Sequence, residues 1–237
     1  MKEQQQYVCF DILMTIFVTV LIISAIASSA KIVDLGFTVL GIPFVFDGGT
    51  LLFPISYVFG DILTEVYGFR TSRRAIWTGF GCLALCSLSL LVLRLLPGEG
   101  LWEASAGSSA YTAILGGVSS GALPIASLVA YTVGEFANSA SLSRLKILMQ
   151  GKYLWVRTIG STLIGELLDS VIFVAIACLA GAFPWELFAA LVVTNYILKC
   201  GIEILMTPVT YTVVSRLKKV ESIDTFDIGV RLNPFFG

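Results

Sequence analysis

Seven charged side chains lie inside the apolar stretches of this 237-residue chain, and their spacing is helical. Together with two asparagines they form four sets: Asp61 and Glu65; Glu135 and Asn138; Glu166 and Asp169; Asn195, Lys199 and Glu203. Spacings of three or four residues place the members of a set on one helix face. An isolated charge near the centre of a membrane helix costs about 2.5–3.5 kcal/mol, so seven would cost on the order of 20 kcal/mol. We therefore expect these side chains to face the interior of a helix bundle.

The expected interior site is strongly acidic. Six carboxylates face a single lysine, Lys199, which gives a formal balance of −5. Like charges this close together in a medium of low dielectric constant cannot all stay ionised. Either some carboxyls hold protons, or a small molecule that is cationic or rich in hydrogen-bond donors visits the site. A purely structural network would be expected to balance its charges better, so the pattern favours a binding site.

Two of the sets also fit a structural role. Glu65 lies near the end of its stretch and could pair with one of the three arginines that follow it, which are Arg70, Arg73 and Arg74. Lys199 and Glu203 are spaced for an ion pair within one helix. A functional role is favoured for the carboxyls in the middle of their stretches, which are Glu135, Glu166 and Asp169.

Six apolar stretches can position these residues. Each is about 20 residues long, the length at which an α-helix crosses the hydrocarbon core of a bilayer. Hydrophobic residues make up 57% of the chain and charged residues only 13%, whereas soluble domains carry about 25% charged residues. The sequence predicts an all-α integral membrane bundle that forms a single domain over residues 1–237. The predicted spans are 8–30, 49–67, 75–96, 122–143, 156–180 and 187–214.

Two of the joints between the predicted spans are long. Residues 31–48 are interpreted as an irregular connection. Residues 97–121 are rich in Gly, Ser and Ala, and residues 101–115 could form a short surface helix with Trp102 at the level of the lipid headgroups. This second joint is either a lid over a cavity or a passive surface loop, and its composition slightly favours the loop.

The basic residues predict the orientation of the bundle. If both termini are cytoplasmic, Lys31 and Arg94 lie outside, Lys199 lies within a span, and the other basic residues lie inside. Because Lys and Arg gather in cytoplasmic loops, we expect both termini to be cytoplasmic. The residues expected inside are Lys2, Arg70, Arg73, Arg74, Arg144, Lys146, Lys152, Arg157, Arg216, Lys218, Lys219 and Arg231.

The composition argues against several classes of function. The chain has no histidine, which removes histidine catalysis and most zinc sites. It contains no GxxxxGK[ST] phosphate-binding loop, and its net charge of −1 argues against nucleic-acid binding. The five cysteines form no CxxC pair and are interpreted as apolar packing residues. We expect no enzymatic activity, no cofactor and no bound metal.

Four blocks of the chain resemble the queuosine precursor transporter family, also called the vitamin uptake transporter-like family. They are FPISYVFGDILTEVYG (53–68), GEFANSASLSRLK (134–146), STLIGELLDSVIF (161–173) and NYILKCGIEILMTPVTY (195–211). The resemblance implies a six-helix importer in the inner membrane for a 7-deazaguanine base: preQ0, preQ1 or queuine. It also implies kinship with the substrate-binding subunits of energy-coupling-factor vitamin transporters.

The same resemblance implies a substrate site at the polar positions of these blocks. Family members vary at the positions of Glu65, Glu135 and Glu166, so the identity of the base stays open. The implied site residues are Asp61, Glu65, Glu135, Asn138, Glu166, Asp169, Asn195 and Lys199.

The chemistry of a 7-deazaguanine suits an acidic site. Its N1–H and N2–H₂ groups form one donor edge, which a carboxylate can accept as a bidentate pair, and its O6 can accept from Lys199 or an asparagine. We assign the donor edge to Glu166 or Glu135. The amine of preQ1 or queuine is cationic near neutral pH, and we assign it to Asp169 or Asp61. Five aromatic residues could stack on the base: Phe53, Tyr57, Phe136, Phe173 and Tyr196.

Two mechanisms of import stay open. In the first, the chain transports alone by alternating access, with proton coupling through the crowded carboxyls. In the second, it is the binding subunit of an ATP-driven importer of a vitamin or nucleobase and needs an external ATPase. A small-residue face on the first span could then dock the ATPase module. That face consists of Ser24, Ala25, Ser28 and Ser29.

Overall fold

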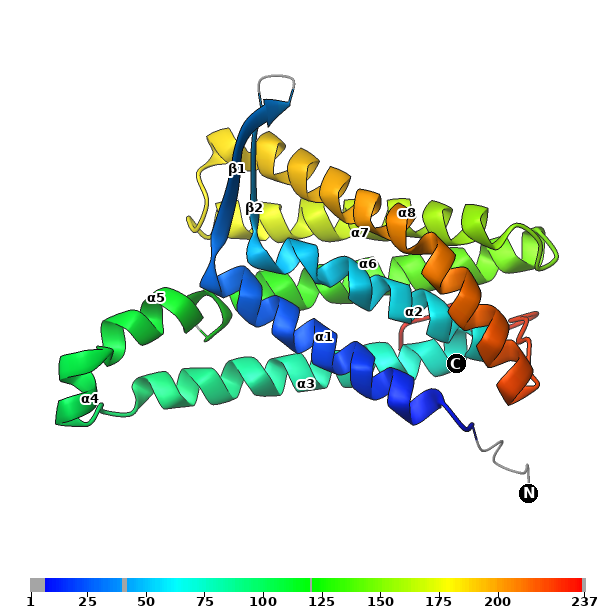
Figure 1. Cartoon of the computed structure of the whole chain (residues 1–237), viewed down its shortest axis with the longest axis horizontal. Coiled ribbons are helices and arrows are strands. Elements are labelled where there is room, and N and C mark those ends of the chain that lie inside the picture. Colours follow the sequence, from blue (N-terminus) through cyan, green and yellow to red (C-terminus); the bar gives the residue numbers. More distant parts are fainter. Residues whose placement is uncertain (1–6, 40–41, 120, 236–237) are drawn as a thin grey trace.

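The protein is a bundle of long helices with one β-hairpin, as Figure 1 shows for a computed structural model that describes residues 7–39, 42–119 and 121–235. Each predicted span contains a helix with similar bounds. The prediction of an all-α membrane bundle is therefore confirmed, with the hairpin as an addition. The helices are α1 (Phe10–Ala30), α2 (Phe53–Tyr67), α3 (Phe69–Leu95), α6 (Leu123–Leu148), α7 (Leu154–Leu179) and α8 (Phe188–Glu221).

Five helical segments among the described residues are long and apolar enough to cross a membrane. The remaining predicted span corresponds to α2, which has only 15 residues and follows a short 3-10 helix, η1 (Gly48–Leu51). The sixth crossing, and with it the single six-span domain, stays a prediction. The five segments are Phe10–Ala30, Phe69–Leu95, Gly107–Leu148, Leu154–Leu179 and Trp185–Glu221.

A β-hairpin occupies the first long joint, which we had interpreted as irregular. Strand β1 (Ile32–Val39) pairs antiparallel with β2 (Ile42–Asp47), so that Ile32 lies opposite Asp47. The joint is rich in β-branched and aromatic residues, which favour strands, and the rings of Phe37 and Phe44 stack with centroids 5.1 Å apart. The hairpin projects beyond the helices (Figure 1) and leads directly into η1. We call this end of the bundle the hairpin end.

The second long joint is helical and packs against the bundle. It forms α4 (Gly100–Ser105) and α5 (Gly107–Ser119) instead of one short helix over 101–115. Ser29 of α1 donates a hydrogen bond to the carbonyl of Ile114 in α5 at 2.7 Å. The joint is therefore not a loose loop, and its role as a lid stays a prediction.

Helices α6 and α7 approach each other closely at two glycines, one on each helix. A Cβ atom added at Gly134 would lie 2.9 Å from the carbonyl oxygen of Gly165, and one added at Gly165 would lie 2.9 Å from that of Gly134. Only glycine permits such an approach between helices. Because Glu135 and Glu166 follow these glycines directly, the contact also brings the two carboxyls into one neighbourhood.

The small-residue face of α1 packs inside the chain. Ser24 donates to the carbonyl of Gly49 at 3.0 Å, and Ser28 donates to Asp47 Oδ1 at 2.5 Å. Ser29 is engaged with α5. The hydroxyls of this face thus bind η1, the hairpin and α5, and its predicted role in docking an external ATPase module stays a prediction.

The basic residues gather at the end opposite the hairpin, which we call the basic end. It comprises the α2–α3 joint, the α6–α7 joint and the end of α8 with the residues after it. All the basic residues expected inside lie there, except Lys2, which is outside the described residues. Lys31 directly follows α1 and Arg94 lies in the last turn of α3, away from the basic end. The asymmetry that predicted the orientation is thus present in the fold.

Candidate functional site

The eight polar residues of the predicted site are all buried within the bundle, with 7% exposure or less. Burial is what the cost of placing polar groups in lipid requires. They do not form one group, however, because the structure divides them among three clusters. The residues are Asp61 and Glu65 on α2, Glu135 and Asn138 on α6, Glu166 and Asp169 on α7, and Asn195 and Lys199 on α8.

The first group, which we call the lysine cluster, consists of Glu166, Asp169, Asn195 and Lys199. Lys199 Nζ forms a short ion pair with Asp169 and lies 3.2 Å from Glu166 Oε2. The ammonium also lies 4.4 Å from the centroid of the Phe53 ring, in a cation–π contact. Lys199 therefore bridges two carboxyls one turn apart on α7. The structural alternative of an ion pair between Lys199 and Glu203 is not formed.

The second group, the acidic cluster, consists of Asp61, Glu135, Asn138 and Glu203. Asn138 Nδ2 donates to Asp61 Oδ1 at 2.7 Å. Both carboxyl oxygens of Glu135 and both of Glu203 are buried without a hydrogen-bond partner. Buried polar atoms normally have hydrogen-bond partners. These four oxygens therefore need protons or hydrogen-bond donors that the side chains of the cluster do not supply. Glu203 was noted in the sequence but was not assigned to the site.

The third group is a cage of basic residues around Glu65. Glu65 Oε2 accepts from Arg157 Nη1 at 2.5 Å, and Oε1 accepts from Lys218 Nζ at 2.6 Å. Lys146 Nζ lies 3.4 Å from Oε1. The expected pairing with Arg70, Arg73 or Arg74 is wrong. Those arginines follow the break at Gly68, where φ is +83°, and therefore belong to the next helix.

The segment after α8, residues 222–235, packs across the Glu65 cage and closes the basic end. Lys146 Nζ donates to Asp224 Oδ1 at 2.5 Å. Asp227 Oδ2 accepts from the backbone N–H of Phe69 at 2.9 Å, and Trp77 Nε1 donates to the carbonyl of Pro234 at 2.9 Å. This C-terminal segment thereby ties the start of α3 to the end of α6.

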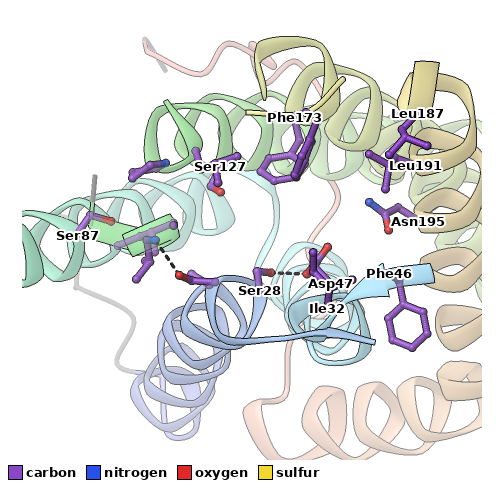
Figure 2. A pocket seen from close by; sticks show the side chains of 18 residues that line it. Ser28, Ile32, Phe46, Asp47, Ser87, Ser127, Phe173, Leu187, Leu191 and Asn195 are labelled. Atoms are coloured by element: carbon purple, nitrogen blue, oxygen red, sulfur yellow. Dashed lines mark hydrogen bonds between the residues drawn. The ribbon is translucent and has the colours of Figure 1, made fainter. Parts of the chain in front are cut away.

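A cavity of about 280 Å³ lies at the hairpin end. Figure 2 shows its mostly apolar wall, with Asp47 and Asn195 among its few polar side chains. A smaller cavity of about 50 Å³ shares Asp47, Phe173 and Asn195 with it and continues to Asp169 and Lys199. A concave apolar wall with a few convergent polar groups is typical of a small-molecule site. The two cavities form a route from the hairpin end to the lysine cluster.

Three of the eight predicted residues line this route: Asp169, Asn195 and Lys199. The other five line neither cavity. Glu166 lies one helical turn closer to the basic end than Asp169, beyond the Lys199 ammonium. The lysine cluster therefore forms the floor of the route, and the acidic cluster lies beneath that floor.

Sequence reasoning missed Asp47, the polar residue that the end of the hairpin contributes to the cavity. Asp47 Oδ2 accepts from Thr50 Oγ1 at 2.9 Å, and Thr50 Oγ1 lies 3.4 Å from Asn195 Oδ1. Asp47 also accepts the backbone N–H of Thr50 and so caps η1. The signal was present in the letters DGGT at 47–50, because Asp before a short helix is a common N-cap.

Two of the five aromatic candidates reach the cavities. Phe173 lines both and Phe53 lines the smaller one. Phe136 instead packs in the core, with its ring centroid 5.7 Å from that of Trp77. Tyr196 donates to the carbonyl of Leu163 at 3.3 Å. Tyr57 is fully buried, and its hydroxyl has no hydrogen-bond partner.

The part of the chain that resembles known proteins includes the clusters described above. A family model described as "Putative vitamin uptake transporter" matches residues 47–213. A "Probable queuosine precursor transporter" of Bacillus subtilis (strain 168) is 27% identical over 167 residues, 69% of each chain. One of the same name from Haemophilus influenzae (strain ATCC 51907 / DSM 11121 / KW20 / Rd) is 26% identical over 181 residues, 75% of this chain and 72% of the relative. No solved structure matches the chain. The matched region contains Asp47, the lysine cluster and the acidic cluster.

Proposed function

The chain belongs to the vitamin uptake transporter family, and we propose that it imports a 7-deazaguanine precursor of queuosine by alternating access. Both relatives carry the name of queuosine precursor transporters, and a family of transporters argues for a carrier rather than an enzyme. The proposed location is the inner membrane, with both termini in the cytoplasm. The basic residues gathered at one end of the bundle support this orientation.

The observation that carries the proposal is the route from the hairpin end to the lysine cluster. A flat base entering it would pass Phe173 and reach a floor of Asp169, Asn195 and Lys199. The carboxylate of Asp169 can accept hydrogen bonds from the base, and the ammonium and amide can donate to its O6. These are the complementary partners of a guanine-like edge.

Charge distinguishes the three candidate bases at this floor. PreQ1 and queuine carry a cationic amine, which would compete with Lys199 for Asp169. If the amine displaces Lys199 from Asp169, Lys199 keeps its contact with Glu166 Oε2, and Glu166 Oε1 can accept the donor edge, as we assigned from the sequence. PreQ0 is neutral and would leave the ion pair of Lys199 with Asp169 in place. Binding of preQ1 or queuine would therefore rearrange this ion pair, whereas binding of preQ0 would not.

The described conformation corresponds to an outward-facing state under the proposed orientation. The cavity lies at the hairpin end, and the Glu65 cage with the C-terminal segment closes the basic end. Alternating access would open the basic end and close the cavity around the base. An ATP-driven importer is the alternative, but the α1 face that would have supported docking of an ATPase is occupied within the chain.

Uptake by the chain alone tests the proposal. We would express it in a queuosine-deficient strain with an impaired salvage importer, supply each base separately, and measure queuosine in tRNA. The wild-type chain should restore queuosine, and Asp169→Asn should abolish the rescue while the protein still inserts. The matched control is Glu186→Gln, which changes an exposed carboxyl that lines neither cavity, and it should behave as wild type.

The outcomes separate the two mechanisms. Rescue only when ATPase subunits are supplied would support the ATP-driven alternative, and no uptake under either condition would exclude both. Thermal stabilisation of the purified protein by preQ0, preQ1, queuine and guanine gives an independent measure of binding. Equal stabilisation by guanine and the 7-deazaguanines would contradict the proposed substrate class.

A further inference from the structure

Glu135 is the central carboxyl of the acidic cluster. It is fully buried, and neither of its oxygens has a hydrogen-bond partner. A Cβ atom added at Gly60 would lie 1.8 Å from Glu135 Oε1, so the carboxyl rests directly on the backbone of α2. The absence of a side chain at Gly60 thus creates the space that Glu135 occupies.

Glu135 faces ionisable groups from four helices of the bundle, α2, α6, α7 and α8. Among the described residues, the groups within its electrostatic range are acidic or phenolic. They are Tyr57 and Asp61 on α2, Tyr131 on its own helix α6, Glu166 and Asp169 on α7, and Glu203 on α8. Two cations among the described residues lie near this centre, and both are bound to other carboxyls. Lys199 is bound to Asp169 and Glu166, and Arg157, which lies near Asp61, is bound to Glu65.

A second observation points to an occupant of the cluster. The Tyr57 hydroxyl is fully buried and has no partner, although it is a good donor in an acidic surrounding. A Cβ atom at Gly134 would lie 2.4 Å from this hydroxyl and 2.9 Å from Asp169 Cβ. The hydroxyl therefore lies beside the backbone that precedes Glu135 and beside Asp169, which lines the route. Tyr57 thus lies near both Asp169 and Glu135, and its hydroxyl is hydrogen-bonded to neither.

The occupant that fits is a proton. Within the described residues, no group of three or more His, Cys, Asp or Glu side chains is arranged to hold a metal ion. Buried carboxylates without partners carry a large desolvation cost, and a bound proton removes that cost without needing more ligands. It also turns a carboxylate into a donor, which the surrounding oxygens can accept.

We propose that Glu135 is the proton-binding residue of a proton-coupled import cycle, an inference that rests on the proposed transport function. An O–H bond forms on Glu135 with a proton that enters from the hairpin end past Asp169 and Tyr57. The same bond breaks when the proton leaves at the basic end. Ionised Glu135 repels Asp61, Glu166 and Glu203 and so opposes closure of their helices. Protonation removes that repulsion and permits the bundle to close over the base.

The variant Glu135→Gln mimics the protonated state permanently and gives a specific test. In proteoliposomes of the full chain, we would measure accumulation of labelled preQ1 driven by a pH gradient, and exchange of preQ1 with no gradient. For one proton per base, a gradient of about one pH unit supports about a tenfold accumulation. Glu135 lines neither cavity, so in this proposal it binds the proton, and the donor edge of the base is left to Glu166. We therefore expect the variant to lose this accumulation and to keep exchange within about twofold of wild type.

Each outcome decides the question. Gradient-driven accumulation by Glu135→Gln equal to wild type would overturn the proposal, and so would loss of both accumulation and exchange, which would place Glu135 in the binding site or in the fold. Exchange without accumulation in the wild type would reject proton coupling and leave the proposed transport intact. No binding and no exchange in the wild type would reject the transport function itself.

An infrared measurement tests the proton directly and needs no substrate. The purified wild-type protein at neutral pH should show an absorption band from protonated carboxylic acid, which weakens in Glu135→Gln. The matched control is Glu186→Gln, whose exposed carboxyl should leave the band unchanged. A band of equal strength in wild type and Glu135→Gln would show that Glu135 is ionised and would reject the assignment.

Discussion

At the scale of single residues, Glu65 and Glu135 are both buried carboxyls, but they differ in whether basic side chains neutralise them. Glu65 is surrounded by Arg157, Lys146 and Lys218, which come from three different helices. Glu135 has no such partner. A buried ion pair is costly to break because the surviving charge is left without compensation. Glu65 is therefore expected to serve stability, whereas Glu135 is free for a functional role.

Replacing Glu65 should destabilise the protein strongly. Glu65→Gln leaves three basic side chains around a neutral amide, and breaking a buried pair costs about 3–5 kcal/mol. We expect a clearly lower Tm in thermal unfolding of the detergent-solubilised protein. The exposed Glu186→Gln is the control and should melt as wild type. An unchanged Tm for Glu65→Gln would mean that the cage adds nothing to stability.

The partners of Glu65 show where prediction from sequence ends. Burial of Glu65 followed from its place in an apolar stretch, but Arg157 lies 92 positions away in the chain. We had counted Arg157 and Lys146 among the basic residues on the cytoplasmic side, yet both are buried in the cage. Hydropathy predicts which residues enter the membrane. It does not predict how far each helix is rotated about its axis, and that rotation selects the partners.

At the scale of elements, the contact of α6 with α7 sets the geometry of both clusters. The two helices meet at Gly134 and Gly165, with no room for a Cβ atom on either side. Each glycine directly precedes a carboxyl that faces the centre of the bundle. A change in the spacing of these helices would therefore displace Glu135 and Glu166 together.

The variant Gly165→Ala should separate the helices. Its Cβ atom would lie 2.7 Å from Asn138 Cβ and 2.9 Å from the carbonyl of Gly134, and overpacking of this kind costs about 1–3 kcal/mol. We expect a lower Tm together with reduced uptake. Gly81→Ala in α3 is the control, because nothing lies within 4 Å of the added Cβ there. Equal melting of the two variants would contradict the close contact.

The elements themselves were largely predictable from the sequence. Long apolar stretches gave helices at every predicted span, because a helix satisfies its own backbone inside lipid. The hairpin was missed because residues 31–48 were treated only as a joint between apolar spans, although residues 33–39 alternate in the two-residue period of a strand. Asp47 was missed for the same reason, although it caps η1 and lines the cavity.

At the scale of the whole molecule, the two ends of the bundle are unlike. The hairpin end holds the cavity, and the basic end is held shut by ion pairs to the C-terminal segment. Partial burial would raise the pKa of Asp224, but hydrogen bonds from Lys146 and Lys218 outweigh burial and lower it from its usual value. The closed basic end thus depends on Asp224 being ionised.

Acid should loosen the C-terminal segment. A carboxyl with a lowered pKa contributes stability above its unfolded pKa, and that contribution is lost as the pH falls through the folded value. For Asp224 this window lies below about pH 4. Hydrogen exchange of residues 222–235 should therefore become faster, relative to the rest of the chain, between pH 5 and pH 3. Because Asp224 is partly exposed, the change should be modest.

The variant Asp224→Asn provides the comparison for this acid effect. At pH 6 its segment should already exchange about as fast as the wild-type segment does in acid, and further acidification should add little. Ser143, which donates to Asp227 at 2.7 Å, offers a matched change in Ser143→Ala that leaves Asp224 in place. If Asp224→Asn keeps the wild-type response to acid, another group controls the segment.

Helix α2 is shorter than the other long helices of the bundle. Fifteen residues at 1.5 Å each span about 22 Å, whereas the hydrocarbon core of a bilayer is about 30 Å thick. The Asp47 cap lies just before one end of α2, and the break at Gly68 lies at the other. Under the predicted six-span arrangement, the helical barrier between the two aqueous compartments would be shortest along α2, which carries Asp61. A small tilt of the neighbouring helices could then open the buried clusters first to one compartment and later to the other, without a large movement of any domain.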